Sequence, residues 1–479
     1  MHLLKVAGVC PARESAKASV IIPLLASNPL SFIRLGAFLL KKGLSFFSLL
    51  ATCLLLFSCS SSSNNNSSTG SRSGLKFRAF VSNPLEPATR GTLPVINIVD
   101  ALKDVLSNSF VSVSASAPEP TFMVLFPNKR FTLVYSGSNT SLAVVDNSTE
   151  SVVGGTSNAT TTSIALPGAS QSAVVSTDNA TGFAAVPAAP PPNGQIDNLP
   201  PGLVEILNLT NNTISAEIPV EGARFLALSP DGARLLVFGS RPDTITIITP
   251  RAVGSNQPAI VTPISSPSLD HPVSAVFSSD SHTAYILNCG PECGGVQASV
   301  TPFDVNSSSA LTPISVNGAT VALLSGTNLY VAGTNPATAC TASTLATHCG
   351  TLSVIDVGSS SVATTAEITD GYHDRMQMGA NNRLFIGAHT CTNISSQNNN
   401  GNGEIRGCLS IASTHAQSIP NVVIPPDNGD VTGIQPIATR NVVYVAQDGE
   451  LGIYDTTTDK LQATQVDIRG QAQDVKLVD

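Results

Sequence analysis

The stretch GTLSVIDVGSSSV at residues 350–362 decides the fold, because versions of it return along the chain. Other copies are SLAVVDNST at 141–149, GLVEILNLTNNTI at 202–214 and ELGIYDTTTDKL at 450–461. An alternating apolar strand precedes each copy, as in LYVAGT at 329–334 and VVYVAQDG at 442–449. A repeat of about 50 residues that contains only short strands predicts an all-β ring of four-stranded blades, a β-propeller.

Seven such units follow one another from Phe122 onward, and ATQVDI at 463–468 is expected as the outer strand of the last. An eighth unit is split between the chain ends: KFRAFVS at 76–82, PVINIVD at 94–100 and FVSVSAS at 110–116 supply three strands, and AQDVKLVD at 472–479 supplies the innermost one. This closure hides two sheet edges. We therefore expect eight blades across residues 76–479. In the alternative, Ile96, Val99, Leu102 and Val105 form one helical face and the ring has seven blades.

The first 58 residues are expected to be a leader. Lys41 and Lys42 precede an uncharged, largely apolar run at 43–57, as in a secretory signal. Its end resembles the bacterial lipoprotein signal, whose final cysteine is cleaved at and diacylated: Leu56, Ser58 and Cys59 match, while Phe57 is bulkier than usual. The alternative is a membrane-spanning anchor, although the run is shorter than the ~20 apolar residues that a span needs. The polar residues 59–75 are expected to form a flexible tether.

Charge argues against nucleic acid as a partner. Removal of residues 1–58 takes away 6 of the 24 Lys and Arg residues and 1 of the 32 Asp and Glu residues, which leaves a net charge of −13. Nucleic-acid binding requires a positive surface.

The resemblance to lipoproteins implies a lipid (palmitate) anchor on Cys59 and a place in the bacterial cell envelope, at the outer membrane on its periplasmic side or surface.

Six cysteines remain after the leader and Cys59 are set aside. They fall after equivalent strands of three successive units, which favours three local disulfide bonds: Cys289 with Cys293, Cys340 with Cys349, and Cys391 with Cys408. An oxidising compartment would preserve such bonds. Zinc is the competing interpretation, but the intervening segments of three, eight and sixteen residues do not show the usual two-residue spacing of zinc thiolates.

The repeats resemble those of the bacterial YVTN-type, or surface-layer-like, β-propeller family over residues 76–479. The matching motifs are Leu329-Tyr330-Val331-Ala332, Val443-Tyr444-Val445-Ala446, the turn at 229–232 and Val354-Ile355-Asp356. The chain is also similar to lactonase-like propellers, without a catalytic motif that carries over. Members of the family differ in function, so the resemblance implies a fold more than an activity.

Polar residues just before the innermost strands are the candidate site, because they should surround the mouth of the central axis. They are Arg224, Asp270, His271, Tyr372, His373, Asp374, Arg375 and Asp430. Histidine beside carboxylates can bind a metal or transfer protons, whereas polar links are also expected wherever loops meet water. The sequence assigns no catalytic residue, metal ligand or cofactor, and it contains no nucleophile elbow, phosphate loop, calcium loop or H-E-x-x-H motif.

Two functions remain open. The first is a non-enzymatic binding or scaffolding module that presents its disulfide-closed loops to a protein or glycan, since loops ordered in advance lose less entropy on binding. The bonds could equally serve only to protect an exposed protein from unfolding. The second function is a lactonase-like hydrolase or a quinone- or metal-dependent oxidoreductase that uses His271, His373 and Asp374. Convergence of these three side chains on one point would favour the enzyme.

Overall fold

The structure is a computed structural model that describes residues 72–479, apart from 90, 114–118, 158–161, 191–199, 252–257, 337–349, 393, 396–404, 415–420 and 427–428. Contacts within the chain separate residues 1–67 from residues 68–479. The predicted leader, Cys59 and the pair Cys340 and Cys349 lie outside the described residues. No helix in the described part of the chain is long and apolar enough to cross a membrane.

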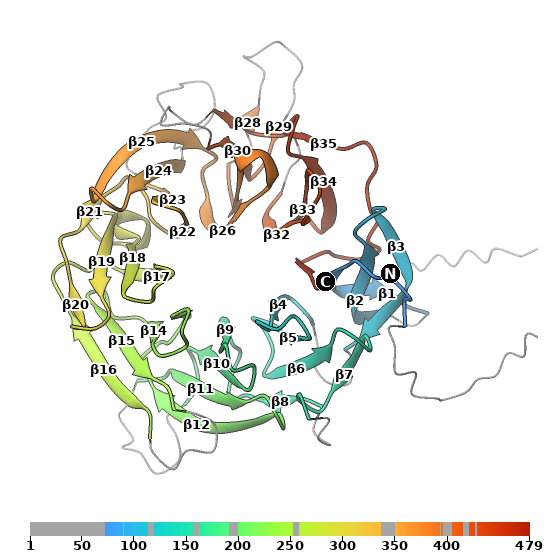
Figure 1. Ribbon diagram of the computed structural model, residues 1–479, viewed down its shortest axis with the longest axis horizontal. Helices are drawn as coiled ribbons and strands as arrows, with labels where there is room; N and C mark the ends of the chain where they lie inside the picture. The colour runs from blue at the N-terminus through green and yellow to red at the C-terminus, as the bar shows by residue number, and fades with distance from the viewer. Residues whose placement is uncertain are drawn as a thin grey trace, which may run out of the picture. The chain divides into compact units, whose positions relative to one another are not determined.

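Eight antiparallel sheets of four main strands each stand around a common axis (Figure 1). We number these blades along the chain and give their strands from the axis outward. Blade 1 contains β36 (Asp474–Leu477), β1 (Arg78–Pro87), β2 (Thr92–Asp100) and β3 (Val105–Ser112). Blade 2 contains β4 (Phe122–Leu125), β5 (Phe131–Tyr135), β6 (Ser141–Asp146) and β7 (Ser151–Val153), with β8 (Ile164–Ala165) also on β6. Blade 3 contains β9 (Ser172–Val175), β10 (Thr181–Val186), β11 (Leu203–Asn208) and β12 (Thr213–Pro219).

The next three blades follow the same order. Blade 4 contains β13 (Phe225–Leu228), β14 (Leu235–Phe238), β15 (Thr244–Thr249) and β16 (Ile260–Ser265). Blade 5 contains β17 (Pro272–Phe277), β18 (Thr283–Asn288), β19 (Ser299–Asp304) and β20 (Ser309–Ala310). A short strand, β21 (Ile314–Ser315), also pairs with β19, and the 3₁₀ helix η1 (Gly290–Cys293) follows β18. Blade 6 contains β22 (Val321–Ser325), β23 (Asn328–Thr334), β24 (Gly350–Asp356) and β25 (Ser361–Ile368).

Two blades complete the ring. Blade 7 contains β26 (Tyr372–Met378), β27 (Arg383–His389), β30 (Leu409–Ser413) and β31 (Val422–Val423). The 3₁₀ helix η2 (Ala380–Asn382) joins β26 to β27. A separate hairpin of β28 (Ile394–Ser395) and β29 (Ile405–Arg406) comes between β27 and β30 in the chain. Blade 8 contains β32 (Val431–Pro436), β33 (Val442–Gln447), β34 (Glu450–Asp455) and β35 (Lys460–Leu461).

The two ends of the propeller meet in blade 1, which confirms the predicted eight-bladed ring. Strand β36 pairs antiparallel with β1, from Ala79 opposite Leu477 to Ser82 opposite Asp474. The seven-bladed alternative is wrong, because residues 96–106 form the end of β2, a turn at 101–104 and the start of β3 rather than a helix. Asp104 makes this turn with a φ of 57°, a left-handed conformation that interrupts any helix.

Apolar clusters between neighbouring blades form the core. Successive side chains on a strand point to opposite faces, so each inner strand serves two interfaces. In β23, Leu329 and Val331 join the cluster shared with blade 5, whereas Tyr330 and Ala332 join the one shared with blade 7. An apolar cluster of this kind lies at every one of the blade junctions, including the junction between blades 8 and 1. Outer strands such as β16 are mostly exposed.

The recurring aspartate of the sequence repeat has a local structural role. It ends the third strand of a blade and accepts hydrogen bonds from backbone N–H groups in the turn that follows. Asp304 accepts them from Asn306 and Ser307, Asp356 from Ser359, and Asp455 from Thr457, over 2.7–3.0 Å. Such side-chain bonds to the backbone initiate turns. They account for the persistence of the motif without a binding function.

One outer strand differs from the expectation. The fourth strand of blade 8 is β35 at Lys460–Leu461, and residues 463–468 contribute only an isolated bridge between Val466 and Leu451. Val466 and Ile468 nevertheless bury their side chains in the cluster between blades 8 and 1. The alternating apolar pattern of ATQVDI therefore reflects burial rather than a regular strand.

Candidate functional site

Both described disulfide bonds lie on one face of the ring, where the innermost strands begin and the second strands end; we call it the mouth face. Cys289 and Cys293 enclose η1 directly after β18, and their Cα atoms are 5.7 Å apart. Cys391 follows β27, Cys408 precedes β30, and their Cα atoms are 5.6 Å apart. These are the partners that the repeat register predicts.

A β-bulge recurs near the start of the innermost strand in three blades. The pairing register shifts between Pro272 and Ser274, between His373 and Arg375, and between Val431 and Gly433. Each shift inserts one residue, respectively Val273, Asp374 and Thr432. Because a bulge redirects the side chains beside it, the sequence alternation does not predict which residues face the mouth here.

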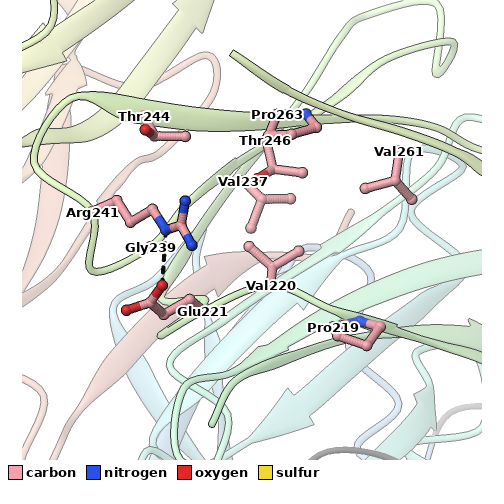
Figure 2. A pocket seen from close by; sticks show the side chains of 10 residues that line it. All are labelled: Pro219, Val220, Glu221, Val237, Gly239, Arg241, Thr244, Thr246, Val261 and Pro263. Carbon is pink, nitrogen blue, oxygen red and sulfur yellow. Dashed lines mark hydrogen bonds and ion pairs between the residues drawn. The ribbon is translucent and has the colours of Figure 1, made fainter. Parts of the chain in front are cut away.

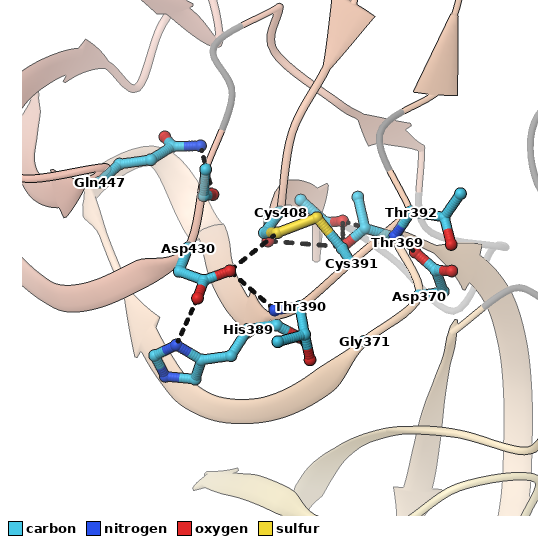
Figure 3. The surroundings of a disulfide bond; sticks show 12 residues. Thr369, Asp370, Gly371, His389, Thr390, Cys391, Thr392, Cys408, Asp430 and Gln447 are labelled. Carbon is cyan, nitrogen blue, oxygen red and sulfur yellow. Dashed lines mark hydrogen bonds and ion pairs between the residues drawn. A yellow bond between two sulfur atoms is a disulfide. The ribbon is translucent and has the colours of Figure 1, made fainter. Parts of the chain in front are cut away.

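Asp374 and Asp430 lie on either side of His389 at the mouth face. His389 Nε2 is 3.0 Å from Asp374 Oδ1, and His389 Nδ1 is 3.7 Å from Asp430 Oδ2. Arg375 pairs with the other oxygen of Asp374 at 2.8 Å and donates to the Thr432 carbonyl. Figure 3 shows the His389 ring turned toward Asp430, beside the disulfide bond between Cys391 and Cys408. The nearby Asp374 carboxylate raises the pKa of His389 against the opposing effect of burial.

Glu292 and Tyr372 are further polar groups of this face. Burial raises the pKa of Glu292 to about 7, although its Oε2 accepts a 2.9 Å hydrogen bond from the backbone N–H of Thr334. Burial also raises the pKa of Tyr372 to about 12; the Asp374 and Glu292 carboxylates raise it further, and Arg224 and Arg375 oppose them. Tyr372 is therefore within electrostatic range of two carboxylates and two guanidinium groups.

Asp270 and His271 form a separate pair on blade 5. Their Oδ1 and Nδ1 atoms are 2.8 Å apart, and Asp270 Oδ2 also accepts from the backbone N–H groups of Val296 and Gln297. Burial alone would raise the pKa of Asp270, but these hydrogen bonds hold it below its usual value. His271 also lines a pocket with Arg224 and Cys293.

His373 does not reach the solvent of the mouth face. Its side chain is fully buried, and its Cε1 lies where a Cβ on Gly350 of blade 6 would collide with it. Within the described part of the chain, neither ring nitrogen has a partner at good hydrogen-bond geometry, although the Thr369 backbone weakly opposes the effect of burial. Burial lowers the pKa of this imidazole to about 4, so it stays neutral near pH 7. It is a core histidine between blades 6 and 7 rather than a group available to a ligand.

The sequence-predicted residues thus fall into three settings. Tyr372, Asp374 and Arg375 are near one another, Asp430 joins them through His389, and Arg224 and Glu292 lie within electrostatic range. Asp270 and His271 form their own pair, and His373 is buried. Sequence reasoning missed His389 and Glu292. The signal for both was their position beside a loop cysteine, since Glu292 precedes Cys293 and His389 comes two residues before Cys391.

No set of three or more His, Cys, Asp or Glu side chains in the described ranges has an arrangement that could hold a metal ion. The geometry of the mouth face instead offers fixed hydrogen-bond donors, acceptors and charges.

Comparison with known proteins supports the fold alone. No protein-family model and no curated protein sequence matches the chain. The solved structure of dihydro-heme d1 dehydrogenase NirN is similar with a TM-score of 0.57 at 11% identity, over 86% of this chain and 77% of that one. The Dos1 propeller is similar with a TM-score of 0.52 at 11% identity, over 74% of this chain and 85% of that one.

A Bacteroides fragilis protein assigned as a 6-phosphogluconolactonase gives a TM-score of 0.45 at 15% identity, over 85% of this chain and 99% of that one, which is too low to support an argument. The resemblance to YVTN-type propellers stays an expectation from the sequence motifs.

Proposed function

We propose that this protein is a binding module of the bacterial cell envelope, held at the membrane by a lipid on Cys59, and that its mouth face recognises a protein or glycan partner. The leader motif and the polar tether support the anchor. The proposal for the recognition face depends on one structural observation, the cross-bracing of the mouth face.

Hydrogen bonds join neighbouring blades around much of this face. His271 N donates to the Pro242 carbonyl between blades 4 and 5, and Thr334 N donates to Glu292 between blades 6 and 5. Thr334 Oγ1 donates to the Gly371 carbonyl next to blade 7, and Arg375 Nε donates to the Thr432 carbonyl of blade 8. Thr390 N donates to Asp430 at 2.7 Å and closes a second contact between blades 7 and 8.

These bonds and the two disulfide bonds hold charged side chains in place before any partner arrives. A surface ordered in advance loses little conformational entropy on binding, so more of the interaction energy appears as affinity. The turns on the opposite face contain the structural aspartates Asp304, Asp356 and Asp455 instead.

Hydrogen exchange of the full-length protein in detergent tests the recognition face. Envelope proteins and glycans are screened for binding, and exchange is compared with and without the bound partner. We expect protection at residues 289–297, 389–392 and 430–432 and unchanged exchange in the opposite turns near Asp356 and Asp455. The proposal is contradicted if the screen finds no binding partner, or if the partner protects only the turns on the opposite face.

Metabolic labelling with a palmitate analogue tests the anchor. Label is expected on the wild-type protein and absent from Cys59→Ser, while Cys53→Ser serves as the matched control because it also lies in the leader region. Equal labelling of Cys59→Ser and the wild type would rule out lipid attachment at Cys59.

The catalytic alternative has weaker support. Of the three side chains on which it rests, His373 is buried against Gly350, His271 pairs with Asp270, and Asp374 pairs with His389 and Arg375. Their contacts are with different groups, so they do not define one reaction centre. A lactonase-like or oxidoreductase mechanism through these residues is therefore the less favoured proposal.

A further inference from the structure

A pocket of about 260 Å³ opens on the mouth face between blades 4 and 5. It is lined by Arg224, Phe225, Gly239, Ser240, Arg241, His271, Pro272, Val273 and Cys293. Its volume is just below the range of about 300–1,000 Å³ that is typical of pockets for drug-sized ligands. The pocket therefore fits one small ring-sized unit and is too small for a folded segment of a partner protein.

The walls of the pocket are fixed by close backbone packing. A Cβ on Gly239 would collide with the Glu221 carbonyl, and the φ of Gly222 is 57° where it approaches Ser240. Arg224 N donates to the Phe238 carbonyl at 2.8 Å, and His271 N donates to the Pro242 carbonyl. A Cβ on Gly295 would collide with Asp270, which in turn holds His271. The basic side chains are therefore attached to a rigid frame.

Three basic side chains line this pocket, and two of them have acidic partners. Arg241 Nε is 2.8 Å from Glu221 Oε2, and His271 Nδ1 is 2.8 Å from Asp270 Oδ1. Arg224 is exposed, and its guanidinium has no ion pair among the residues that the structure describes. The pocket thus presents one guanidinium that is not engaged in an ion pair, and this planar group binds carboxylates through two parallel hydrogen bonds.

The remaining lining supplies the other features of a ring-binding site. Phe225, Pro272 and Val273 provide apolar surface, and Ser240 provides a hydroxyl group. Behind Arg241 lies a second pocket of about 200 Å³ with Val220, Val237 and Val261 in its wall, and the two pockets share Gly239 and Arg241. Figure 2 shows the ion pair of Arg241 and Glu221 at the edge of this second pocket.

We infer that the pocket between blades 4 and 5 binds a carboxylated sugar unit, with its carboxylate on Arg224 and its ring against Phe225, Pro272 and Val273. This inference rests on the proposed function and specifies the partner as an acidic glycan. A single unpaired guanidinium matches a monoanion, whereas a phosphate dianion would leave one charge uncompensated beside Glu221 and Asp270.

Titration calorimetry on the full-length protein in detergent tests the inference with glucuronate as the probe, and with glucose and glucose 6-phosphate as comparison ligands. We expect glucuronate to bind at least tenfold more tightly than either. Arg224→Gln should lower the affinity for glucuronate at least tenfold, and Arg224→Lys should restore part of it. Arg251→Gln is the matched control, because Arg251 is exposed beyond the other end of β15 and should leave binding unchanged.

Equal binding of glucose and glucuronate, tighter binding of glucose 6-phosphate, or an unaltered affinity in Arg224→Gln would each overturn the inference. If the protein ignores glucuronate but binds a neutral glycan or a protein with protection of the mouth face, this inference fails and the proposed function stands. If it binds nothing at all, both fail.

Discussion

Glu205 is a buried acid that the function does not use. It lies in β11 opposite Glu217 of β12, its side chain is fully buried, and neither carboxylate oxygen has a hydrogen-bond partner among the described residues. Burial raises its pKa from 4.5 to about 7, and the nearby Glu217 carboxylate contributes. The folded protein therefore holds this proton over a pH range in which the unfolded chain releases it.

The sign of the resulting pH dependence follows from linkage. Between pH 4.5 and 7 the native state binds more protons at Glu205 than the unfolded state, so stability decreases as the pH rises. Glu205→Gln removes this cost, and we expect a gain of about 2–3 kcal/mol at pH 8 that disappears near pH 4. Glu217→Gln is the control, with a smaller gain because it removes only repulsion. Denaturant unfolding at pH 4 and pH 8 measures the free energy of unfolding of each variant. A gain of equal size at both pH values would contradict a raised pKa of Glu205.

His373 predicts the opposite dependence on pH. Its pKa falls from 6.5 to about 4 on burial, so below pH 6.5 the unfolded chain takes up a proton that the native state refuses. This histidine should contribute a loss of about 3 kcal/mol as the pH falls from 6.5 to 4. In His373→Leu that part of the slope should be absent, whatever the change in absolute stability. Denaturant unfolding between pH 4 and 6.5 measures this slope. His282→Asn is the control for the loss of a histidine, because His282 is exposed. An unchanged slope in His373→Leu would contradict the burial argument.

The sequence located the rim of the mouth better than it located individual side chains. Tyr372, Asp374, Arg375 and Asp430 were predicted from an expected place just before an inner strand, and the structure puts them near one another, although β26 already begins at Tyr372. The prediction that His373 lies at the mouth was wrong, because neighbouring residues of a strand point to opposite sides and the bulge at Asp374 changes this alternation. His389 was missed because it ends a second strand, whereas all the candidate residues were expected just before innermost strands.

At the level of elements, the two disulfide bonds differ in the loops that they close. Cys391 and Cys408 are 17 positions apart, and Cys289 and Cys293 only 4. A bond that closes a longer loop removes more entropy from the unfolded chain, which corresponds to about 3 kcal/mol for the first and about 2 kcal/mol for the second. The double variant Cys391→Ser/Cys408→Ser should therefore lose more stability than Cys289→Ser/Cys293→Ser.

Thermal unfolding of both variants without reductant measures this difference, and the wild type in excess reductant should be no more stable than the combined variant. A larger loss from the shorter bond would show that native contacts of η1, rather than loop closure, dominate its contribution. Loss of either pair should not unfold the ring, because the apolar clusters between blades consist mainly of other side chains, although Cys408 and Cys391 contribute to the cluster between blades 7 and 8.

Strands were predictable where alternation and turn residues agreed. The Ser229 to Gly232 turn has Gly232 at a φ of 72° and a hydrogen bond from Gly232 N to the Ser229 carbonyl, as its sequence implies. Residues 463–468 were misjudged because side chains that alternate in burial need not pair their backbone. The secondary structure of residues 96–106 was ambiguous, because their apolar residues fit both the spacing of a helix and that of a strand. Only the pairing of β2 with β1 and β3 shows that they form strands.

At the scale of the whole molecule, residues 474–479 hold the first and last parts of the ring together. Val475, Leu477 and Val478 are buried, and Asp474 accepts a 2.9 Å hydrogen bond from Met123 N of blade 2. Asp479 pairs with Arg78 at 2.7 Å, and the same guanidinium pairs with Glu150 of blade 2 at 2.8 Å. Arg78 therefore links the last residue of the chain to two blades.

Removal of residues 474–479 should cost more than any single substitution discussed above. Three buried apolar side chains contribute about 5 kcal/mol or more together, which is comparable to the whole stability of many domains. The truncation also exposes the edge of β1, and an unpaired edge recruits other chains. We expect a large fall in the midpoint of thermal unfolding together with oligomers in size-exclusion chromatography. Asp479→Asn keeps the strand and weakens only the ion pair, so it should cost about 1–2 kcal/mol and remain monomeric. A truncated protein that stays monomeric with the wild-type unfolding midpoint would mean that the ring is stable without its closing strand.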